Sequence, residues 1–539
     1  MPLHRLSKYF QKNGVYVKKN YIGIDFGTSN CSVAAWVDGK VVLIPVDDDF
    51  NDKFKIRSSI FIREDDKPLP TPTAERITYF IGQIKNELTR NKVRAQDQLD
   101  DLIGSAKNNR GTNKVPSTYK NSNTYISLIN TINNVDAQIE NVNVLSSRAK
   151  RLAISEIYAQ LKTASLDEML TKGTIEFGEA GFQQYLSTPE AGKLVNSPKN
   201  FLGADIGKSH LQVFETVVGR LLSYLRLKAE AELDQPIHKA VIARPVHYHS
   251  TLGEAGNIQA ISIMERAAAA AGFDEVQFIF EPMAAALHFE KQLEQERTVM
   301  IVDLGGGTSD VVICKLSPER VNQTDRQADI LSVKGNRIGG IVCDKDFAMT
   351  SVSPYFGRGE LLRGGAPIPH MIFNGMVDID NFPLLNDFYL PKHRHEIERF
   401  MDLAKSANKL NRLRTLQKSK LVHRFMSDVE KAKINLSDCN RFNLSLDYID
   451  ENTAVPLKSI DMSKSMTTWL NELKHLIDDS ITTANSSPEL IYITGGMGLS
   501  PAVQTAIKDW FPSTEITIAD PFNSVASGAA IHAHLAFGE

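Results

Sequence analysis

The 539-residue chain has few cysteines, no excess of one charge and no long apolar run. Its four cysteines lie far apart and form no C-x-x-C pair, which excludes a disulfide scaffold and a zinc site built on cysteine pairs. The 61 basic and 64 acidic side chains give a net charge of −3, which argues against a dedicated nucleic-acid-binding protein. No window of about 20 apolar residues predicts a membrane span. The first twenty residues are basic but lack the apolar core of a secretory signal. We therefore expect a protein of the reducing cytoplasm with no nucleic-acid or membrane partner.

What the sequence does contain is a repeated strand pattern. Residues 21–46 alternate apolar and polar side chains around two tight turns, DFGTSN and Asp38-Gly39, which predicts strands joined as hairpins. Residues 298–315 repeat the order of apolar strand, acidic residue, glycine-rich turn and second strand about 280 residues later, which predicts two related lobes. Strands also alternate with helices in the rest of the chain, which indicates an α/β class. These segments are 239–246, 257–273, 276–293 and 489–511.

Two stretches interrupt this pattern and are predicted to be insertions. Residues 105–145 are rich in Asn and Ser and precede a helical pattern at 146–170, which predicts a polar excursion or a small helical subdomain. Residues 353–400 contain Gly and Pro at irregular intervals, and a long amphipathic stretch follows up to Leu436. No heptad register in that stretch is long enough for a coiled coil.

The first glycine-containing turn, at residues 25–30, follows a predicted strand. Gly27 permits a sharp change of direction, and Thr28 and Ser29 offer hydroxyl and N–H donors. Asp25, at the end of the strand, can hold a hydrated cation nearby. The turn suits phosphate oxygens, although the same residues also fit a plain hairpin turn with a polar rim.

The second turn runs from Asp303 to Asp310 and contains three consecutive glycines. Three glycines cost several kcal/mol of backbone entropy, at roughly 0.5–1 kcal/mol each, which is a poor choice for a turn without a ligand. Asp303 and Asp310 flank Thr308, an arrangement that suits a divalent metal and an attacking water beside a triphosphate. The glycines are Gly305, Gly306 and Gly307.

A third turn lies at residues 494–498, between a strand and the start of a helix. Gly495 and Gly496 would let a nucleoside or a phosphate approach the backbone and the positive end of the helix. A Gly-Gly turn of this kind serves a purely structural purpose about as often as it binds a ligand.

These three loops, in this order, resemble those of the actin-like ATPase superfamily. The closest match is the DnaK-type heat-shock chaperone family (the heat-shock protein 70 family), and within it the short YegD-like bacterial branch. Four further segments resemble motifs of that family: KNFLG, EPMAAAL, NRIGG and EKAKINLS, at 199–203, 281–287, 336–340 and 430–437. The resemblance covers about 21–64 and 173–539.

The resemblance implies a two-lobed actin-like ATPase fold, built from duplicated ribonuclease-H-like domains around a deep nucleotide cleft. Residues 1–20 would be a basic tail, and residues 21–295 the first lobe, with an insertion at about 65–172. Residues 296–518 would be the second lobe, with an inserted helical subdomain at about 345–440. Residues 519–539 would form a C-terminal helix that returns to the first lobe.

The resemblance also implies a role for each site residue around ATP or ADP and Mg²⁺. Asp25 and Asp303 would hold Mg²⁺ through its waters, with Glu281 and Asp310 ordering that shell. Lys199 would bring a positive charge to the γ-phosphate, and Thr308 would lie near the attacking water. Glu430, Lys433 and Ser437 fall at i, i+3 and i+7, on one helical face that would grip ribose and base. The implied nucleotide-binding set is Gly27, Thr28, Ser29, Gly305, Gly306, Gly307, Gly339, Gly340, Glu430, Lys433, Ser437, Gly495 and Gly496.

Some residues depart from the family pattern. Ile434 replaces the arginine expected to stack on adenine, Met497 and Leu499 replace a serine and an arginine, and Phe522 replaces an acidic residue. These changes touch nucleoside recognition rather than phosphate chemistry. Full-length members continue into a hydrophobic linker and a peptide-binding β-sandwich, and we expect this chain to lack that domain because it ends at Glu539.

We therefore expect a slow Mg-dependent ATPase that acts as a chaperone-like conformational switch, with protein clients or co-chaperones as possible partners. One alternative is a non-hydrolysing, nucleotide-bound interaction module whose partner surface is at 65–172 or 353–420. Another is a small-molecule kinase of the same superfamily, for which Asp310 is the one candidate base that the sequence offers.

Overall fold

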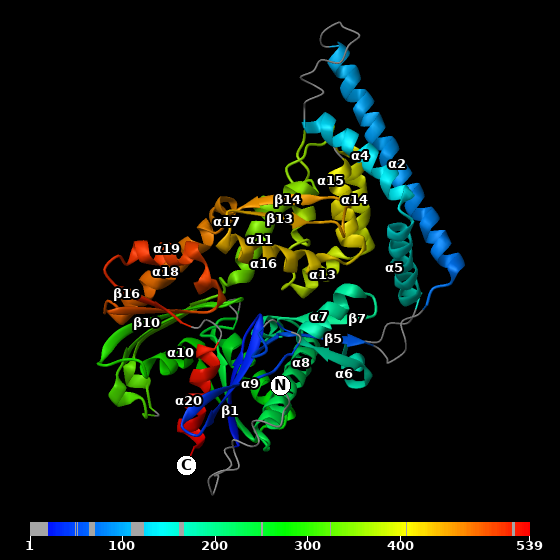
Figure 1. Ribbon diagram of the computed structural model, residues 1–539. Coiled ribbons are helices and arrows are strands. Elements are labelled where there is room, and N and C mark those ends of the chain that lie inside the picture. Colours follow the sequence, from blue (N-terminus) through cyan, green and yellow to red (C-terminus); the bar gives the residue numbers. More distant parts are fainter. Residues whose placement is uncertain are drawn as a thin grey trace.

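The computed structural model describes residues 20–48, 50, 52–63, 71–108, 123–160, 166–248, 252–323, 325–405, 407–519 and 523–538. The predicted tail at 1–20 therefore lies outside the described residues except for Asn20, and so does Phe522. The chain is a mixture of helices and sheets, which confirms the α/β class. Figure 1 shows two sheet-containing bodies in the lower half and a group of helices above them.

The first large sheet has the strand order β3-β2-β1-β8-β9, with β4 paired to β2. β1, β2 and β3 are antiparallel neighbours, whereas β8 and β9 continue the sheet in parallel with β1. The strands are β1 (Tyr21–Phe26), β2 (Asn30–Val37), β3 (Lys40–Ile44), β4 (Lys55–Arg57), β8 (Lys239–Arg244) and β9 (Glu275–Phe280).

The second large sheet has the order β12-β11-β10-β15-β16, which repeats the first with each strand in the corresponding place. β10, β11 and β12 are antiparallel neighbours, and β15 and β16 run parallel to β10. The strands are β10 (Arg297–Leu304), β11 (Ser309–Leu316), β12 (Ile330–Asn336), β15 (Leu490–Thr494) and β16 (Glu515–Ile518). Two separate stretches of sequence thus build one strand topology twice.

Helices cover both faces of the first sheet because alternate side chains of β1 point to opposite faces. Ile22 and Ile24 pack beneath α8 (Lys208–Leu233) and α9 (Glu254–Ala270). Tyr21 packs instead against α20 (Ser524–Phe537), the C-terminal helix, which crosses β1. A Cβ on Gly23 would lie 2.1 Å from the backbone nitrogen of Ala530, so only glycine allows this close approach.

The second sheet is covered in the same way. Val299 and Ile301 pack against α10 (Glu281–Glu290), while Met300 and Val302 face a larger core with α11 (Gly340–Phe347) and α18 (Thr467–Ala484). Because α10 packs against α20, this helix pair lies between the two sheets. The remaining elements of this body are η2 (Pro318–Arg320), η3 (Gln327–Asp329), η6 (Gly496–Leu499), α17 (Ser459–Ser465) and α19 (Pro501–Trp510).

The first predicted insertion is helical where it is described. α2 (Ala74–Asn108), α4 (Asn123–Glu140) and α5 (Val142–Gln160) pack along an apolar seam that includes Ile84, Leu88 and Val135. Of the two readings of the Asn-rich stretch, the helical subdomain fits its described part. Below these helices is a three-stranded sheet, β6-β5-β7, with short helices beside it. These elements are β5 (Ser59–Arg63), β6 (Thr174–Phe177), β7 (Gly192–Asn196), α6 (Leu166–Lys172), α7 (Gly178–Ser187) and η1 (Pro198–Phe201).

The second predicted insertion is also helical and touches the first. Arg414 donates to Glu87 at 2.5 Å and Arg94 to Asp402 at 2.9 Å, and all four residues line a cavity of about 510 Å³. Figure 1 shows α2 beside α14 (Pro391–Leu403) and α15 (Ala407–Lys418), the helices that carry these residues. Within the described ranges, none of the helices has the length and apolar character that crossing a membrane requires. The elements here are η4 (Ala348–Val352), η5 (Ser353–Phe356), α12 (Met371–Asn374), α13 (Phe382–Phe388), α14 (Pro391–Leu403), α15 (Ala407–Lys418), α16 (Val422–Asp438), β13 (Arg441–Ser445) and β14 (Ala454–Lys458).

Candidate functional site

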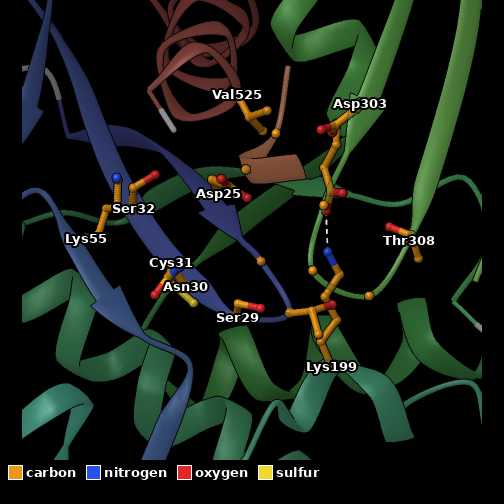
Figure 2. Close-up of a pocket in the computed structure, with 18 residues that line it drawn as sticks. Asp25, Ser29, Asn30, Cys31, Ser32, Lys55, Lys199, Asp303, Thr308 and Val525 are labelled. Carbon is orange, nitrogen blue, oxygen red and sulfur yellow. Dashed lines mark hydrogen bonds and ion pairs between the residues drawn. The ribbon is translucent and has the colours of Figure 1, made fainter. Parts of the chain in front are cut away.

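The first and second glycine-containing turns meet across a small pocket (Figure 2). The turn between β1 and β2 faces the turn between β10 and β11, and the cavity between them has a volume of about 90 Å³. A Cβ on Gly306 would lie 2.1 Å from Ser29 Oγ, and one on Gly307 would lie 2.5 Å from Thr28 Oγ1. The two turns can therefore approach this closely only with glycine at these positions.

Four carboxylates are gathered around this pocket. Asp25 is the second-last residue of β1, and Asp303 holds the same place in β10, opposite Asp310 of β11 in the register. Glu281 is the first residue of α10, where the positive end of the helix favours a carboxylate. Asp303, Asp310 and Glu281 are each less than a tenth exposed.

Lys199 brings a buried positive charge to this site. It lies in the short helix η1, is 4% exposed, and its Nζ forms an ion pair with Glu281 Oε1. Burial disfavours its charged form, but Glu281, Tyr248 and Asp25 outweigh that effect, so the pKa of Lys199 is raised. The lysine therefore stays protonated at neutral pH.

The aspartates have unusually high proton affinities. Burial, followed by the charge of Glu281, raises the pKa of Asp25 and that of Asp310 to about 7 in each case. The pKa of Asp303 is also raised, by burial first and then by Glu281, Asp310 and Asp25. So many carboxylates packed together favour binding of a cation, which would relieve their mutual repulsion.

Among the described residues, no three His, Cys, Asp or Glu side chains are grouped so that they could hold a metal ion directly. A cation here would therefore contact them through water molecules, as Mg²⁺ usually does because it keeps several of its waters.

Two further loops close around the second turn. The backbone N–H of Gly340 donates to Gly305 O at 3.0 Å, and that of Ile341 donates to Gly306 O at 2.9 Å. A Cβ on Gly339 would lie only 2.3 Å from Gly306 O. From the other side, Gly495 has a φ of +82° and packs against Leu304. The NRIGG loop and the third turn thus both reach the pocket region.

The α16 residues expected to hold a nucleoside lie next to the pocket rather than in its lining. Lys433 of α16 pairs with Asp344 at 2.9 Å, and a Cβ on Gly340 would lie 3.5 Å from Lys433 Nζ and 3.1 Å from Met497 Cγ. On the same helix, Ser437 donates to the carbonyl of Lys433 at 3.4 Å. Burial lowers the pKa of Lys433, but the charges of Asp344 and then Glu430 outweigh this effect, so the pKa is raised.

The structure brings the predicted phosphate and metal residues to one pocket. Its lining includes Asp25, Gly27, Thr28, Ser29, Lys199, Glu281, Asp303, Gly305, Gly306, Gly307, Thr308, Gly495 and Gly496. It does not include Asp310, Gly339, Gly340, Glu430, Lys433 or Ser437, which lie behind or beside it. Asp310 accepts instead from the backbone N–H of Val246 at 3.1 Å.

Sequence reasoning missed several lining residues. Lys55 reaches the pocket from β4, which joins the sheet through β2 with Lys55 opposite Ser32. Nothing in the local sequence of β4 signals this placement, because it depends on pairing between distant segments. Asn200, which directly follows Lys199 in the KNFLG segment, lies beside the second turn rather than in the lining, since a Cβ on Gly307 would be 3.0 Å from its Oδ1. It is buried, and its Nδ2 has no hydrogen-bond partner among the described residues.

Comparisons with known proteins agree with this geometry. The chain is 23% identical over 543 residues to the "Iron-sulfur cluster biogenesis chaperone, mitochondrial" of Saccharomyces cerevisiae, covering 99% of this chain and 62% of the yeast protein. It is 25% and 26% identical to the "Chaperone protein DnaK" of Deinococcus deserti and of Mycoplasma mycoides, over 60% of this chain and 43% and 46% of those proteins. The chain thus spans less than two thirds of the length of these curated relatives.

The family model described as "Hsp70 protein" matches residues 192–329 and 396–539, more than half of the chain. These ranges contain the Lys199 segment, the start of α10, the second turn, α16 and the third turn. The chain belongs to the Hsp70 family of DnaK-type chaperones.

Proposed function

We propose that this chain binds Mg·ATP between the two lobes of an actin-like ATPase fold and hydrolyses it slowly. Each lobe would be a ribonuclease-H-like domain built on one of the two sheets of matching strand order. The observation that carries the proposal is the meeting of the two equivalent turns beside the buried Lys199–Glu281 pair. Opposed glycine turns, a fixed cation and clustered carboxylates are what phosphoryl transfer requires of a protein.

The lobes would follow the predicted boundaries, with 21–295 and 296–518 as the two halves. The insertions would be 65–172 and 345–440, and 519–539 would return to the first lobe. The packing of α20 across β1 supports the last assignment.

The residues present fit a Mg-bound triphosphate. The glycine turns offer backbone N–H donors with no side chain in the way, and Thr28 and Ser29 add hydroxyls. Asp25 and Asp303 would hold the hydrated Mg²⁺, and Asp310 keeps one buried oxygen, Oδ2, without a partner among the described residues. The bound metal would neutralise phosphate charge.

The protein's own groups would supply the rest of the catalysis. Glu281 holds Lys199 in one position and in its charged form, so the lysine offers a preorganised positive charge to the γ-phosphate. The hydroxyl of Thr308 would orient the attacking water, and the backbone N–H groups of Gly305–Gly307 would stabilise phosphate oxygens.

The small size of the pocket supports a switching role. Its volume of about 90 Å³ is well below the ~300–1,000 Å³ typical of ligand sites, because the two turns touch. Nucleotide entry would therefore require the turns, and with them the lobes, to separate. Lobe position would then report the nucleotide state to protein clients or co-chaperones, the partners that we propose, in the cytoplasm.

The nucleoside would lie near Gly340, Lys433 and Met497, because both side chains come within 3.5 Å of the place that a Cβ on Gly340 would take. Ile434 is 56% exposed, so an adenine near it would meet an apolar side chain rather than a guanidinium. Glu430 and Ser437 would contact the ribose.

Two alternatives receive unequal support. Exposure of Leu499 and Ile434 beside the nucleoside region favours the non-hydrolysing interaction module as the second candidate, because both would also suit a partner surface. A kinase role for Asp310 is disfavoured, because this carboxylate is 1% exposed and already accepts from Val246. It has no direct access to an acceptor substrate.

Single-turnover hydrolysis of radiolabelled ATP by the intact chain tests the proposal. We expect slow hydrolysis with Mg²⁺ and none with EDTA, together with tight ADP retention. Nucleotide binding without turnover would support the interaction module, and absence of binding would refute both functions. Faster turnover on addition of sugars would support the kinase instead.

A further inference from the structure

Helix α10 carries a buried carboxylate at each end. Glu281 starts the helix and pairs with Lys199, while Glu290 ends it and is 0% exposed. At 1.5 Å per residue the two ends lie about 14 Å apart, so Glu290 is remote from the pocket. No sequence motif that we identified includes Glu290.

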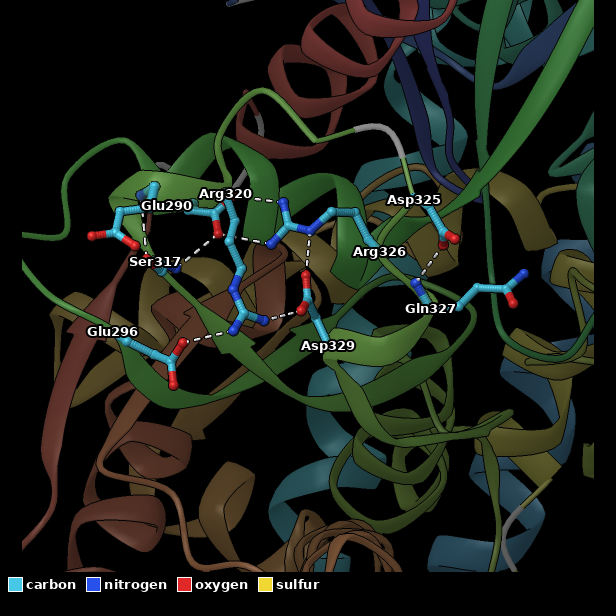
Figure 3. A network of polar contacts seen from close by, with 9 residues as sticks. Glu290, Glu296, Ser317, Arg320, Asp325, Arg326, Gln327 and Asp329 are labelled. Carbon is cyan, nitrogen blue, oxygen red and sulfur yellow. Dashed lines mark hydrogen bonds and ion pairs between the residues drawn. The ribbon is translucent and has the colours of Figure 1, made fainter.

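Glu290 is held by residues of the second sheet's β11–β12 connection (Figure 3). Arg326 donates to both of its carboxylate oxygens at 2.7 Å, and the backbone N–H of Ser317 donates to Oε1 at 2.9 Å. Arg326 is itself 7% exposed, and its Nε donates to Asp329 at 2.6 Å. Arg320 extends the network outward, from Asp329 to the exposed Glu296.

A buried carboxylate at the C-terminal end of a helix is electrostatically unfavourable. The last turn of a helix is its negative end, which disfavours a carboxylate, and burial removes the water that would solvate the charge. Apolar residues of similar volume would often give the same or greater stability. Stability alone therefore does not explain the Glu290–Arg326 pair, and its role has to be sought in the position that it gives to α10.

We propose that Glu290 and Arg326 are positioning residues for Glu281. Their bidentate pair fixes the C-terminal end of α10 to the second sheet, and α10 then holds Glu281 against Lys199. This inference rests on the proposed function, because it assigns a device that aligns the lysine used in hydrolysis.

The packing of α10 makes such transmission feasible. Nine of its ten residues are buried, and Pro282 stiffens its first turn. A Cβ on Gly528 of α20 would lie 1.7 Å from Ala284 O, so the two helices touch along their backbones. A short helix enclosed in this way moves as one body, and a displacement of about 1 Å at a reacting group can lower turnover about 100-fold.

A mutant cycle tests the inference. Single-turnover hydrolysis, ADP affinity and thermal melting are measured for Glu290→Met/Arg326→Met, in the wild-type background and in a Glu281→Gln background. The double substitution removes both buried charges together, so neither is left unpaired. Glu296→Gln is the matched control, because it touches the same network only at its exposed edge.

We expect the double substitution to lower the hydrolysis rate at least 10-fold, with ADP affinity changed less than threefold. In the Glu281→Gln background the same substitution should change the rate less than twofold, because the residue through which it acts is already altered. An equal loss in both backgrounds would show a purely structural role and overturn the inference, as would no loss in either.

If the double substitution prevents folding, Glu290→Gln serves in its place, because it keeps the shape and can still accept from Arg326. A loss of hydrolysis rate by the same factor in the two backgrounds would again overturn the inference. If the wild type binds ATP but does not hydrolyse it, the proposed hydrolysis fails and this inference falls with it. Turnover by the wild type with an additive cycle would refute the positioning role alone.

Discussion

Replacing Lys199 with alanine is the sharpest test of the proposed chemistry. The residue is 4% exposed, and its ammonium group pairs with Glu281 in the wall of the pocket. The substitution removes a buried cation from the pocket lining, and it leaves the Glu281 carboxylate buried without its partner. Catalysis and stability should therefore both change, and by separable amounts.

The expected loss of catalysis follows from the role of a preorganised charge. Removing one group that stabilises the transition state costs about 3–4 kcal/mol, which corresponds to a rate lower by about 10²–10³. Breaking a buried ion pair from one side costs about 3–5 kcal/mol of folding free energy, mostly because the remaining charge is unpaired. Nucleotide binding should persist because the glycine turns are untouched.

Three measurements separate these effects: single-turnover ATP hydrolysis, ADP affinity and thermal melting. Lys199→Ala/Glu281→Gln should recover most of the lost stability, because no unpaired charge remains, but it should not recover turnover. Lys208→Ala is the matched control, since this exposed lysine lies on α8, nine residues further on. Hydrolysis by Lys199→Ala within threefold of the wild-type rate would refute the role given to the lysine.

Further predictions concern the loops, the metal and pH. Gly339→Ala should weaken ADP binding at least 10-fold, because its Cβ would lie 2.3 Å from Gly306 O. Gly364→Ala is the control and should leave the affinity unchanged, because no atom lies within 4 Å of its Cβ. Fluorescence titration measures both affinities. Asp25→Asn should remove most of the Mg²⁺-dependent rise in melting temperature that ATP produces in the wild type, and an undiminished rise would contradict its assignment to the metal. In EDTA and without nucleotide, the protein should lose stability as pH rises from about 4 to about 7. The reason is that the pKa of Asp310 is raised to about 7 from its ordinary 3.8. The folded state therefore binds this proton more tightly than the unfolded state does. Asp310→Asn should flatten this melting profile and be the more stable protein at pH 8 by up to a few kcal/mol, whereas a profile identical to wild type would contradict the raised pKa.

Local sequence was sufficient for the elements whose signals are short in range. Alternating apolar residues and glycine turns predicted the hairpins β1–β2 and β10–β11, and their repetition predicted two similar units. The α/β class follows from the same patterns. The family assignment rests on loop motifs, each of them a few residues long.

The sequence predicted that the first insertion exists but left its structure open. Its Asn and Ser content left a polar excursion and a helical subdomain equally open, because composition does not reveal partners. The seam formed by Ile84, Leu88 and Val135 joins α2 to α4, and this packing decides in favour of helices. The contact of Arg414 with Glu87 could not be foreseen, because each residue alone resembles an ordinary surface charge.

The sequence by itself determined which charged groups this protein possesses near its glycine-containing turns and the segments that resemble family motifs: Asp25, Lys199, Glu281 and Asp303. Only the tertiary structure decided that they meet in one pocket, that Lys55 joins them there, and that Arg326 binds Glu290 at the far end of α10. The physical reason is range. Turn chemistry and strand periodicity act over a few residues, whereas burial, ion pairing and pKa shifts depend on segments that folding brings together from up to several hundred residues apart.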